Sequence, residues 1–239
     1  MAQTATSAQK VLRQSIIKSK SKDLARFFKT KKGEYGEGDK FLGVMVPDIR
    51  KTAVQFKHLP LKEIQKLLKS QWHEERLLGL IILTLKYPDS NLKEKNDIFN
   101  FYLSNTLYIN NWDLVDLSAH KIIGQYLYEY KKDRDILKKL AHSKNIWERR
   151  IAIISTFYFI YKGECNDSLK IAEILIFDTH DLIHKAVGWM LREVGKRCNQ
   201  EKEEEFLKKY YKKMPRTMLR YAIEKFSSKK RKGYLSGRI

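Results

Sequence analysis

The chain has 239 residues, enough for one large domain or one elongated array of repeats. Its 48 Lys and Arg residues outnumber 28 Asp and Glu residues, and the resulting net charge of +20 favours nucleic acid or an anionic membrane surface as the partner. A basic protein without a specialised partner is the alternative. A membrane-spanning helix is excluded, because the longest apolar run, residues 77–85, is far shorter than the ~18 residues that a span requires.

We expect no secretory signal in residues 1–20, which lack an apolar segment next to a small-residue cleavage site. Two cysteines, Cys165 and Cys198, are too few for a disulfide framework or a metal site, and they favour a reducing cytoplasm. His180 and His184 are one helical turn apart, but no Glu follows His180 and no cysteine lies nearby. We therefore expect neither a metal nor a cofactor.

Helical periodicity dominates the chain, which contains only four prolines and eleven glycines. The pattern predicts helices at residues 11–19 and 23–29, followed by a glycine-rich loop at residues 31–46. That loop lacks the spacing of a phosphate-binding P-loop. Pro47 and Asp48 then fit the first turn of the next helix.

From residue 61 onward the periodicity predicts helix pairs: 61–68 with 74–85, 91–103 with 114–128, 133–142 with 147–161, 168–177 with 182–196, and 201–213 with 216–226. Charged residues recur near the start of the second helices, at Arg76, Asp116, Arg150 and Lys185, with separations of 40, 34 and 35 residues. Such a period is typical of HEAT or armadillo repeats. The sequence therefore predicts an all-α, right-handed α-solenoid of HEAT-like antiparallel helix pairs with a concave basic groove.

The predicted organisation is a single HEAT-like domain at residues 1–226 and a basic, flexible C-terminal tail at residues 227–239. The tail contains the run Lys229-Lys230-Arg231-Lys232. We expect the protein to be a monomer.

One motif, Trp112-Asp113-Leu114-Val115-Asp116, is predicted to begin a helix directly after two asparagines. Asp113 fits the N-cap or the first turn, and Trp112 and Asp116 are four residues apart and can share one helical face. In a purely structural interpretation, Trp112 belongs to the core and both aspartates only stabilise the helix N-terminus. In a functional interpretation, an aromatic ring and a carboxylate face the same surface.

Two later segments raise the same choice. Arg149 and Arg150 follow Trp147 at the start of an amphipathic helix, either as solvated cations or as phosphate ligands. Trp189 lies beside Gly188, off the centre of the apolar face of its helix, so it either marks a surface or groove or has a packing role.

Together these segments resemble the bacterial AlkD family of DNA alkylation repair glycosylases. The matching boxes are Trp112-Asp113-Leu114-Val115-Asp116, Trp147-Glu148-Arg149-Arg150-Ile151-Ala152-Ile153 and Ala186-Val187-Gly188-Trp189-Met190-Leu191-Arg192-Glu193, with a further similar segment at residues 41–50. Each box alone is weak, but all of them in order, across almost the whole chain, are specific. Two positions depart from the family pattern: Met45 stands where a polar or basic residue is frequent, and Phe27 where an aromatic hydroxyl can occur.

The resemblance implies a monofunctional glycosylase that excises cationic N3- or N7-alkylated purines from duplex DNA in base excision repair, without flipping the base into a tight pocket. It implies that Asp116 is the catalytic carboxylate, that Trp112 and Trp189 flank the deoxyribose of the lesion, and that Arg150 holds a backbone phosphate. Further predicted DNA contacts are Arg149, Lys185, Arg192 and Arg76. Such a protein is expected in the bacterial cytoplasm, associated with the nucleoid.

Two other classes of protein remain open from the residues alone. A non-catalytic HEAT-type module that binds DNA or structured RNA needs only the basic groove, and a protein-binding solenoid needs only an acidic partner. Neither requires Trp112, Asp116, Arg150 and Trp189 together, so the presence of this set favours the glycosylase.

Overall fold

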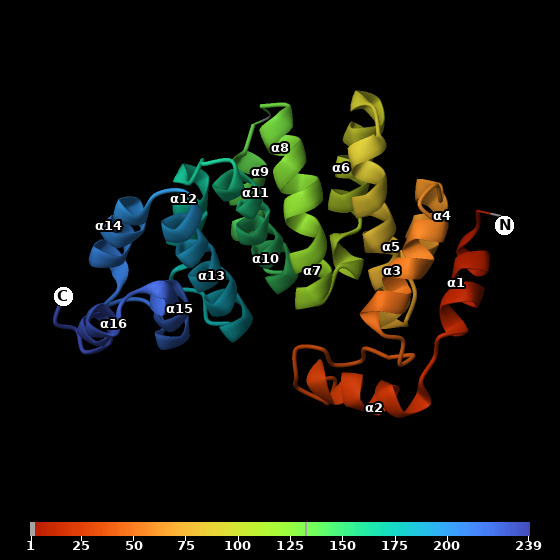
Figure 1. Cartoon of the computed structure of the whole chain (residues 1–239), viewed down its shortest axis with the longest axis horizontal. Helices are drawn as coiled ribbons and strands as arrows, with labels where there is room; N and C mark the ends of the chain where they lie inside the picture. The colour runs from red at the N-terminus through yellow and green to blue at the C-terminus, as the bar shows by residue number, and fades with distance from the viewer. Residues whose placement is uncertain (1–2, 132) are drawn as a thin grey trace. The chain divides into compact units, whose positions relative to one another are not determined.

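The computed structural model describes residues 3–131 and 133–239, and the regular secondary structure of this part of the chain is helical (Figure 1). One isolated β-bridge pairs Lys40 with Trp72. The predicted all-α class is confirmed, and the packing of consecutive helices is consistent with an α-solenoid. None of the helices in the described ranges combines the length and the apolar composition that a membrane span requires.

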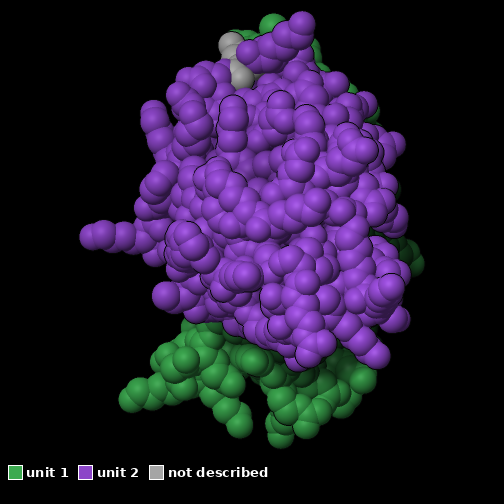
Figure 2. Space-filling model, turned by 90° about the vertical axis from the view of Figure 1, so that its left-hand side faces the viewer, with its two compact units in different colours: residues 1–118 green, residues 119–239 purple. Residues whose placement is uncertain are grey.

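The chain divides by its internal contacts into two compact units, Met1–Ser118 and Ala119–Ile239, which Figure 2 shows in different colours. The single HEAT-like domain predicted for residues 1–226 stays a prediction. Unit 1 contains α1 (Ala5–Arg13), α2 (Lys18–Phe27), α3 (Val46–Gln55), α4 (Leu61–Leu68), α5 (His73–Lys86), α6 (Leu92–Ser104) and the start of α7 (Trp112–Ala119). Short 3₁₀ turns follow α5 at Tyr87–Asp89 and precede α7 at Thr106–Tyr108.

Helix α5 is the centre of unit 1, where it packs against both α3 and α4. Its residues from His73 to Leu83 are all buried, so the four polar residues of its first turn are enclosed together with its apolar body. Gly79 allows this packing, because a Cβ there would lie 3.2–3.3 Å from side-chain atoms of Leu68 and Leu67 on α4. The burial of the first turn matters for the site described below.

The predicted helix boundaries hold in the middle of unit 1 and fail at its beginning. The helix predicted at 61–68 is confirmed as α4, and Pro47 lies in the first turn of α3 as expected. The helix predicted at 11–19 is wrong: α1 starts at Ala5, with Thr4 as its N-cap, and ends at Arg13. The reason is that Ala5, Ala8 and Leu12 form the buried stripe, and small alanines give a weak periodicity signal.

Unit 2 begins with a π-helical turn at His120–Gly124, followed by α8 (Gln125–Glu129), α9 (Asp135–Ala141), α10 (Ile146–Ser155), α11 (Phe157–Tyr161), α12 (Asn166–Leu175), α13 (Asp181–Arg197), α14 (Gln200–Tyr210), α15 (Arg216–Ala222) and α16 (Ser228–Leu235). Helix α10 packs against α9, and α13 packs against α12, α14 and α15. These contacts confirm the predicted pairs 133–142 with 147–161 and 168–177 with 182–196.

The C-terminal residues, predicted to be a basic, flexible tail, contain a helix. Residues 228–235 form α16, whose N-cap is Ser227, and Tyr234 on this helix is buried. The Tyr234 ring lies 5.3 Å from that of Tyr211 and 5.8 Å from that of Phe226, centroid to centroid. An aromatic anchor near the end of the basic run therefore attaches this segment to unit 2.

Candidate functional site

The motif at residues 112–116 lies at the beginning of α7, as predicted. The helix starts there because the Asn111 side chain accepts the backbone N–H of Trp112 at 2.8 Å, and Asp113 accepts that of Leu114 at 2.9 Å. Leu114 and Val115 are fully buried and anchor the helix in the core of unit 1. Trp112 and Asp116 are partly exposed and, being four residues apart, occupy one side of α7.

The indole of Trp112 is held by aromatic residues from the α2 end and the following loop. Its ring stacks on Phe28, with centroids 5.4 Å apart and planes 21° apart, and Phe27 meets it edge-on at 6.0 Å. The indole N–H donates to the hydroxyl of Tyr35 at 3.3 Å. Phe27 is 63% exposed. The Trp112 ring is therefore fixed in orientation while part of it faces solvent.

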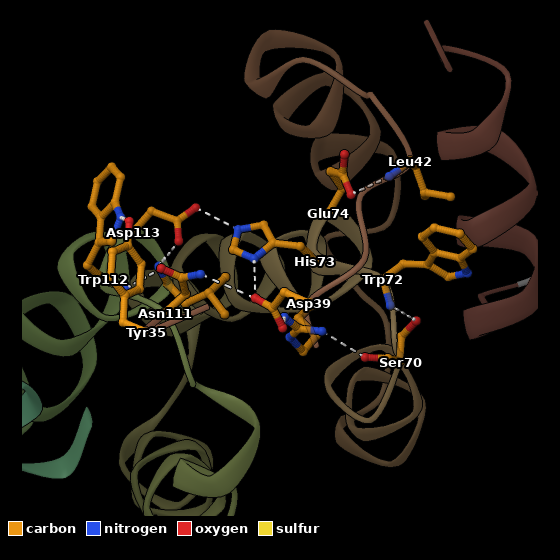
Figure 3. A network of polar contacts seen from close by, with 12 residues as sticks. Tyr35, Asp39, Leu42, Ser70, Trp72, His73, Glu74, Asn111, Trp112 and Asp113 are labelled. Atoms are coloured by element: carbon orange, nitrogen blue, oxygen red, sulfur yellow. Dashed lines mark hydrogen bonds and ion pairs between the residues drawn. The ribbon is translucent and has the colours of Figure 1, made fainter. Parts of the chain in front are cut away.

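Beneath this aromatic group lies a buried network of charges centred on His73, the first residue of α5 (Figure 3). One ring nitrogen of His73 is 2.8 Å from Asp113 Oδ2, and the other is 3.4 Å from Asp39 Oδ2. Asp39 also accepts hydrogen bonds from Arg76 at 2.7 Å and from Asn111 at 3.2 Å. Two carboxylates and two basic side chains thus balance one another inside unit 1.

The electrostatics of this network keep His73 charged. Burial by itself lowers the pKa of His73, but the charge of Asp113 and the hydrogen bonds to Asp113 and Asp39 outweigh it and raise the pKa to about 9. Burial likewise opposes ionisation of Asp39, yet the hydrogen bond from His73 and the charge of Arg76 lower the pKa of that carboxyl. At neutral pH, His73 is an imidazolium that donates to two carboxylates.

Asp116 lies one turn beyond Asp113, near the core of unit 1. Burial raises the pKa of the Tyr102 phenol, and the negative charge of Asp116 contributes to the same shift. The Tyr102 hydroxyl is 2.9 Å from that of Ser118, whose own hydroxyl donates to the Leu114 carbonyl. The carboxylate is therefore partly exposed, and its charge acts on the neighbouring buried phenol.

In unit 2, Trp189 on α13 is partly exposed, and its ring centroid lies 5.9 Å from that of Phe157. Phe157 in turn meets the ring of His120 edge-on at 5.5 Å, and the guanidinium of Arg197 lies 5.6 Å from its centroid. The neighbouring Gly188 is explained by packing, because a Cβ there would lie 2.4 Å from the Met218 carbonyl oxygen of α15. The Trp189 ring is thus supported on one side by Phe157.

Four predicted DNA contacts lie in unit 2 and have protein partners there. Arg149 pairs with Asp178 at 2.6 Å, Lys185 pairs with Asp181 at 2.7 Å, and Arg192 pairs with Glu224. Their side chains retain 19%, 40% and 18% exposure, respectively. Arg150 is 5% exposed and donates to the Leu182 carbonyl, so only a small part of it faces solvent. The phosphate contacts of these residues stay predictions.

Arg76 has a different setting from the one predicted. It is 4% exposed, and its guanidinium donates to Asp39 and to the Ser70 carbonyl. A guanidinium enclosed in this way belongs to the buried network and offers little surface to a phosphate, and the predicted DNA contact of Arg76 stays a prediction.

The sequence interpretation missed Asp39, His73 and the stacking partner Phe28. The available signal was a polar first turn, His73 to Arg76, at the head of a strongly apolar helix. Four polar residues that precede a buried run indicate an internal polar network as readily as a groove. Their partners lie 34 to 40 residues away along the chain, which local patterns do not reveal.

Comparisons with known proteins identify the family and the fold. The family described as DNA alkylation repair enzyme matches residues 8–226. A solved structure described as a predicted DNA alkylation repair enzyme from Enterococcus faecalis has the same fold with a TM-score of 0.71, at 17% identity, over 90% of this chain and 98% of that chain. No curated protein matches the sequence. Because the family match covers most of its length, this chain belongs to the DNA alkylation repair enzyme family.

Proposed function

We propose that the protein is a monofunctional DNA glycosylase that removes cationic N3- or N7-alkylated purines from duplex DNA. The observation that carries this proposal is the start of α7, where a firmly held Trp112 and the Asp116 carboxylate occupy one partly exposed side of the helix. Family membership supports a role in alkylation repair and DNA as the partner. The net charge of +20 supports attraction to the phosphate backbone.

The chemistry needs few protein groups. An alkylated purine carries a positive charge and leaves as a neutral base, so no general acid has to protonate it. As the glycosidic bond lengthens, positive charge develops on the deoxyribose, and a nearby carboxylate stabilises that charge and can orient the attacking water. The face of Trp112 adds cation–π attraction to the same charge. No lysine nucleophile is required, so the strand stays uncut.

Trp112 and Asp116 are partly exposed on α7, and this supports an approach of the lesion's sugar from outside the helix rather than capture of the base in a tight pocket. We retain Trp189, Arg149, Arg150, Lys185 and Arg192 as proposed DNA contacts. The expected location, the bacterial cytoplasm with association to the nucleoid, and the expected monomeric state follow from this function and are part of the proposal.

The test is release of free base from a methylated duplex by the wild-type protein and by Asp116→Asn. The proposal predicts release of 7-methylguanine and 3-methyladenine by the wild type, measured by mass spectrometry of the supernatant. Asp116→Asn is expected to lower the rate by roughly 100-fold or more, because it removes the charge opposite the developing cation. Affinity for intact duplex, measured by fluorescence anisotropy, is expected to change little.

Asp97→Asn is the matched control, because Asp97 is an exposed carboxylate on α6 of the same unit, and its rate should equal that of the wild type. If no variant and no wild-type preparation releases base while duplex binding persists, the protein is a DNA-binding module and the glycosylase proposal is wrong. If Asp116→Asn loses binding as much as activity, the carboxylate is structural.

A further inference from the structure

Three consecutive residues at the start of α7 are each held by a different group of unit 1. Asn111 donates to Asp39 and caps the amide of Trp112. The Trp112 indole stacks on Phe28 and donates to Tyr35. Asp113 pairs with His73. The position of the first turn, and with it the direction of Asp116 three residues later, is therefore set from outside the helix.

His73 is the group that these contacts share. Its imidazole is 1% exposed and lies between Asp39 and Asp113. Two aromatic rings contact the imidazole: the centroid of Phe28 is 4.8 Å away and that of Phe41 is 4.7 Å away. Phe28 also stacks on Trp112, so His73 is connected to residue 113 through a hydrogen bond and to residue 112 through a shared aromatic neighbour.

We propose that His73 is a positioning residue for the proposed excision reaction. His73 clamps Asp113 and thereby fixes the orientation of Trp112 and Asp116 at the start of α7. This inference rests on the proposed function for its activity readout. It assigns different tasks to the two aspartates of the motif: Asp116 faces the lesion, whereas Asp113 is an internal ligand of His73.

The charges of the network support this division. With a pKa of about 9, His73 is protonated at neutral pH and donates from both ring nitrogens. Arg76 neutralises Asp39, and the imidazolium neutralises Asp113. A neutral histidine has only one N–H, so the ring would keep only one of its two hydrogen bonds to carboxylates. If the bond to Asp39 were lost, that carboxylate would still accept from Arg76 and Asn111. The protonated ring is therefore the form that donates to both Asp39 and Asp113.

A double-mutant cycle on single-turnover excision of one 7-methylguanine from a defined duplex tests the proposal. His73→Gln and Asp113→Asn are each expected to slow the chemical step by roughly 10- to 100-fold, because small displacements of reacting groups have effects of this size. Their Kd for duplex should change little. If His73 acts through Asp113, the double variant should be no slower than the slower single variant.

Two further measurements separate positioning from loss of the fold and from loss of the proposed function. His58→Gln is the matched control, an exposed histidine of unit 1, and it should keep the wild-type rate. The ¹⁵N-detected indole N–H signal of Trp112, assigned with Trp112→Phe, should shift or broaden in His73→Gln while that of Trp147 in unit 2 does not. This signal reports on positioning even if the wild type releases no base.

The outcomes are distinct. If the rate losses of His73→Gln and Asp113→Asn multiply in the double variant, the two residues act independently and the proposed clamp is wrong. An unchanged indole signal of Trp112 in His73→Gln would also contradict the clamp. Equal losses in rate and in the folded fraction, measured by circular dichroism at the assay temperature, would assign His73 a purely structural role. Absence of excision in the wild type, with the indole signal moved in His73→Gln, would contradict the proposed function and leave the positioning role intact.

Discussion

The two aspartates of the α7 motif show how strongly the surroundings of a residue decide its task. Both belong to the same short sequence, and both suit a helix N-terminus equally well. In the folded unit, Asp113 accepts from its own helix and from a buried imidazolium, whereas Asp116 lies beside a buried phenol and remains partly exposed. The expected helix-terminal role of Asp113 is confirmed, and its bond to His73 is an addition.

Glu203 is a buried carboxyl of unit 2, and its raised pKa predicts that the stability of the protein depends on pH. Burial raises the pKa of Glu203 to about 8, with a smaller contribution from the charge of Glu204. The folded state therefore holds a proton that the unfolded state loses above about pH 4.5, so stability falls as pH rises from about 4.5 to 8. Glu203→Gln, which keeps the neutral shape, should remove this loss.

The measurement is the melting temperature of the wild type and of Glu203→Gln between pH 5 and pH 9. The gain of the variant over the wild type should grow through this range up to about pH 8 and then level off. Glu205→Gln, at an exposed position of the same helix, is the control and should show no such trend. A gain that is the same at pH 5 and at pH 9 would contradict the buried neutral carboxyl.

Sequence patterns were sufficient for some of the site and insufficient for the rest. Trp112 and Asp116 could be identified because a local motif and helical spacing place them on one side of a helix. Asp39 and His73 could not, because their meeting with Asp113 depends on how the glycine-rich loop returns to α5 and α7. The buried setting of Arg76 could not be predicted for the same reason, because its partner Asp39 lies 37 residues earlier.

At the scale of elements, helices were predictable where large apolar residues repeat, as in α4 and α13. Breaks inside helices were not. The helix expected at 114–128 continues through a π-helical turn at His120–Gly124, where a Cβ on Gly124 would lie 2.1 Å from the Ser155 carbonyl oxygen of α10. The helix expected at 147–161 is interrupted at Thr156, between α10 and α11. The close approach of Gly124 to α10 is a tertiary contact that local patterns do not reveal.

Close contact between α13 and α15 gives a prediction at this scale. In Gly188→Ala the new Cβ would lie 2.4 Å from the Met218 carbonyl oxygen and 2.6 Å from Tyr221 Cβ, and neither the backbone nor a Cβ can turn aside. The substitution should lower the free energy of unfolding by about 1–3 kcal/mol, the usual effect of overpacking. Urea unfolding followed by circular dichroism measures this change.

Gly79→Ala is the control for that experiment. Its Cβ would lie 3.2 Å from Leu68 Cδ2, which can shift, and 3.3 Å from Leu67 Cβ, and the higher helix propensity of alanine acts in the opposite direction. Its loss of stability should therefore be smaller than that of Gly188→Ala. Equal stability of Gly188→Ala and the wild type would show that α13 and α15 do not approach each other so closely in solution.

For the whole molecule, composition and repeat spacing correctly indicated an all-helical protein, and the family match extends over residues 8–226. The division into two units was not foreseen, because the repeat pattern of the sequence runs through residue 118 without a Pro- or Gly-rich linker. The flexible C-terminal tail was predicted from the basic run alone. In the structure this segment forms a helix in which Tyr234 is buried. A run of charged residues is a better guide to the binding partner than to whether the segment is folded.

The central claim is that a carboxylate, without a general acid, is enough to expel a base that is already cationic. Single-turnover excision from two matched duplexes tests it most directly, one carrying 7-methylguanine and the other carrying uracil, a neutral base, at the same position. We predict release of 7-methylguanine with an uncut abasic strand, loss of that release in Asp116→Asn, and no release of uracil. Equal release of both bases, or release of neither, would contradict the account.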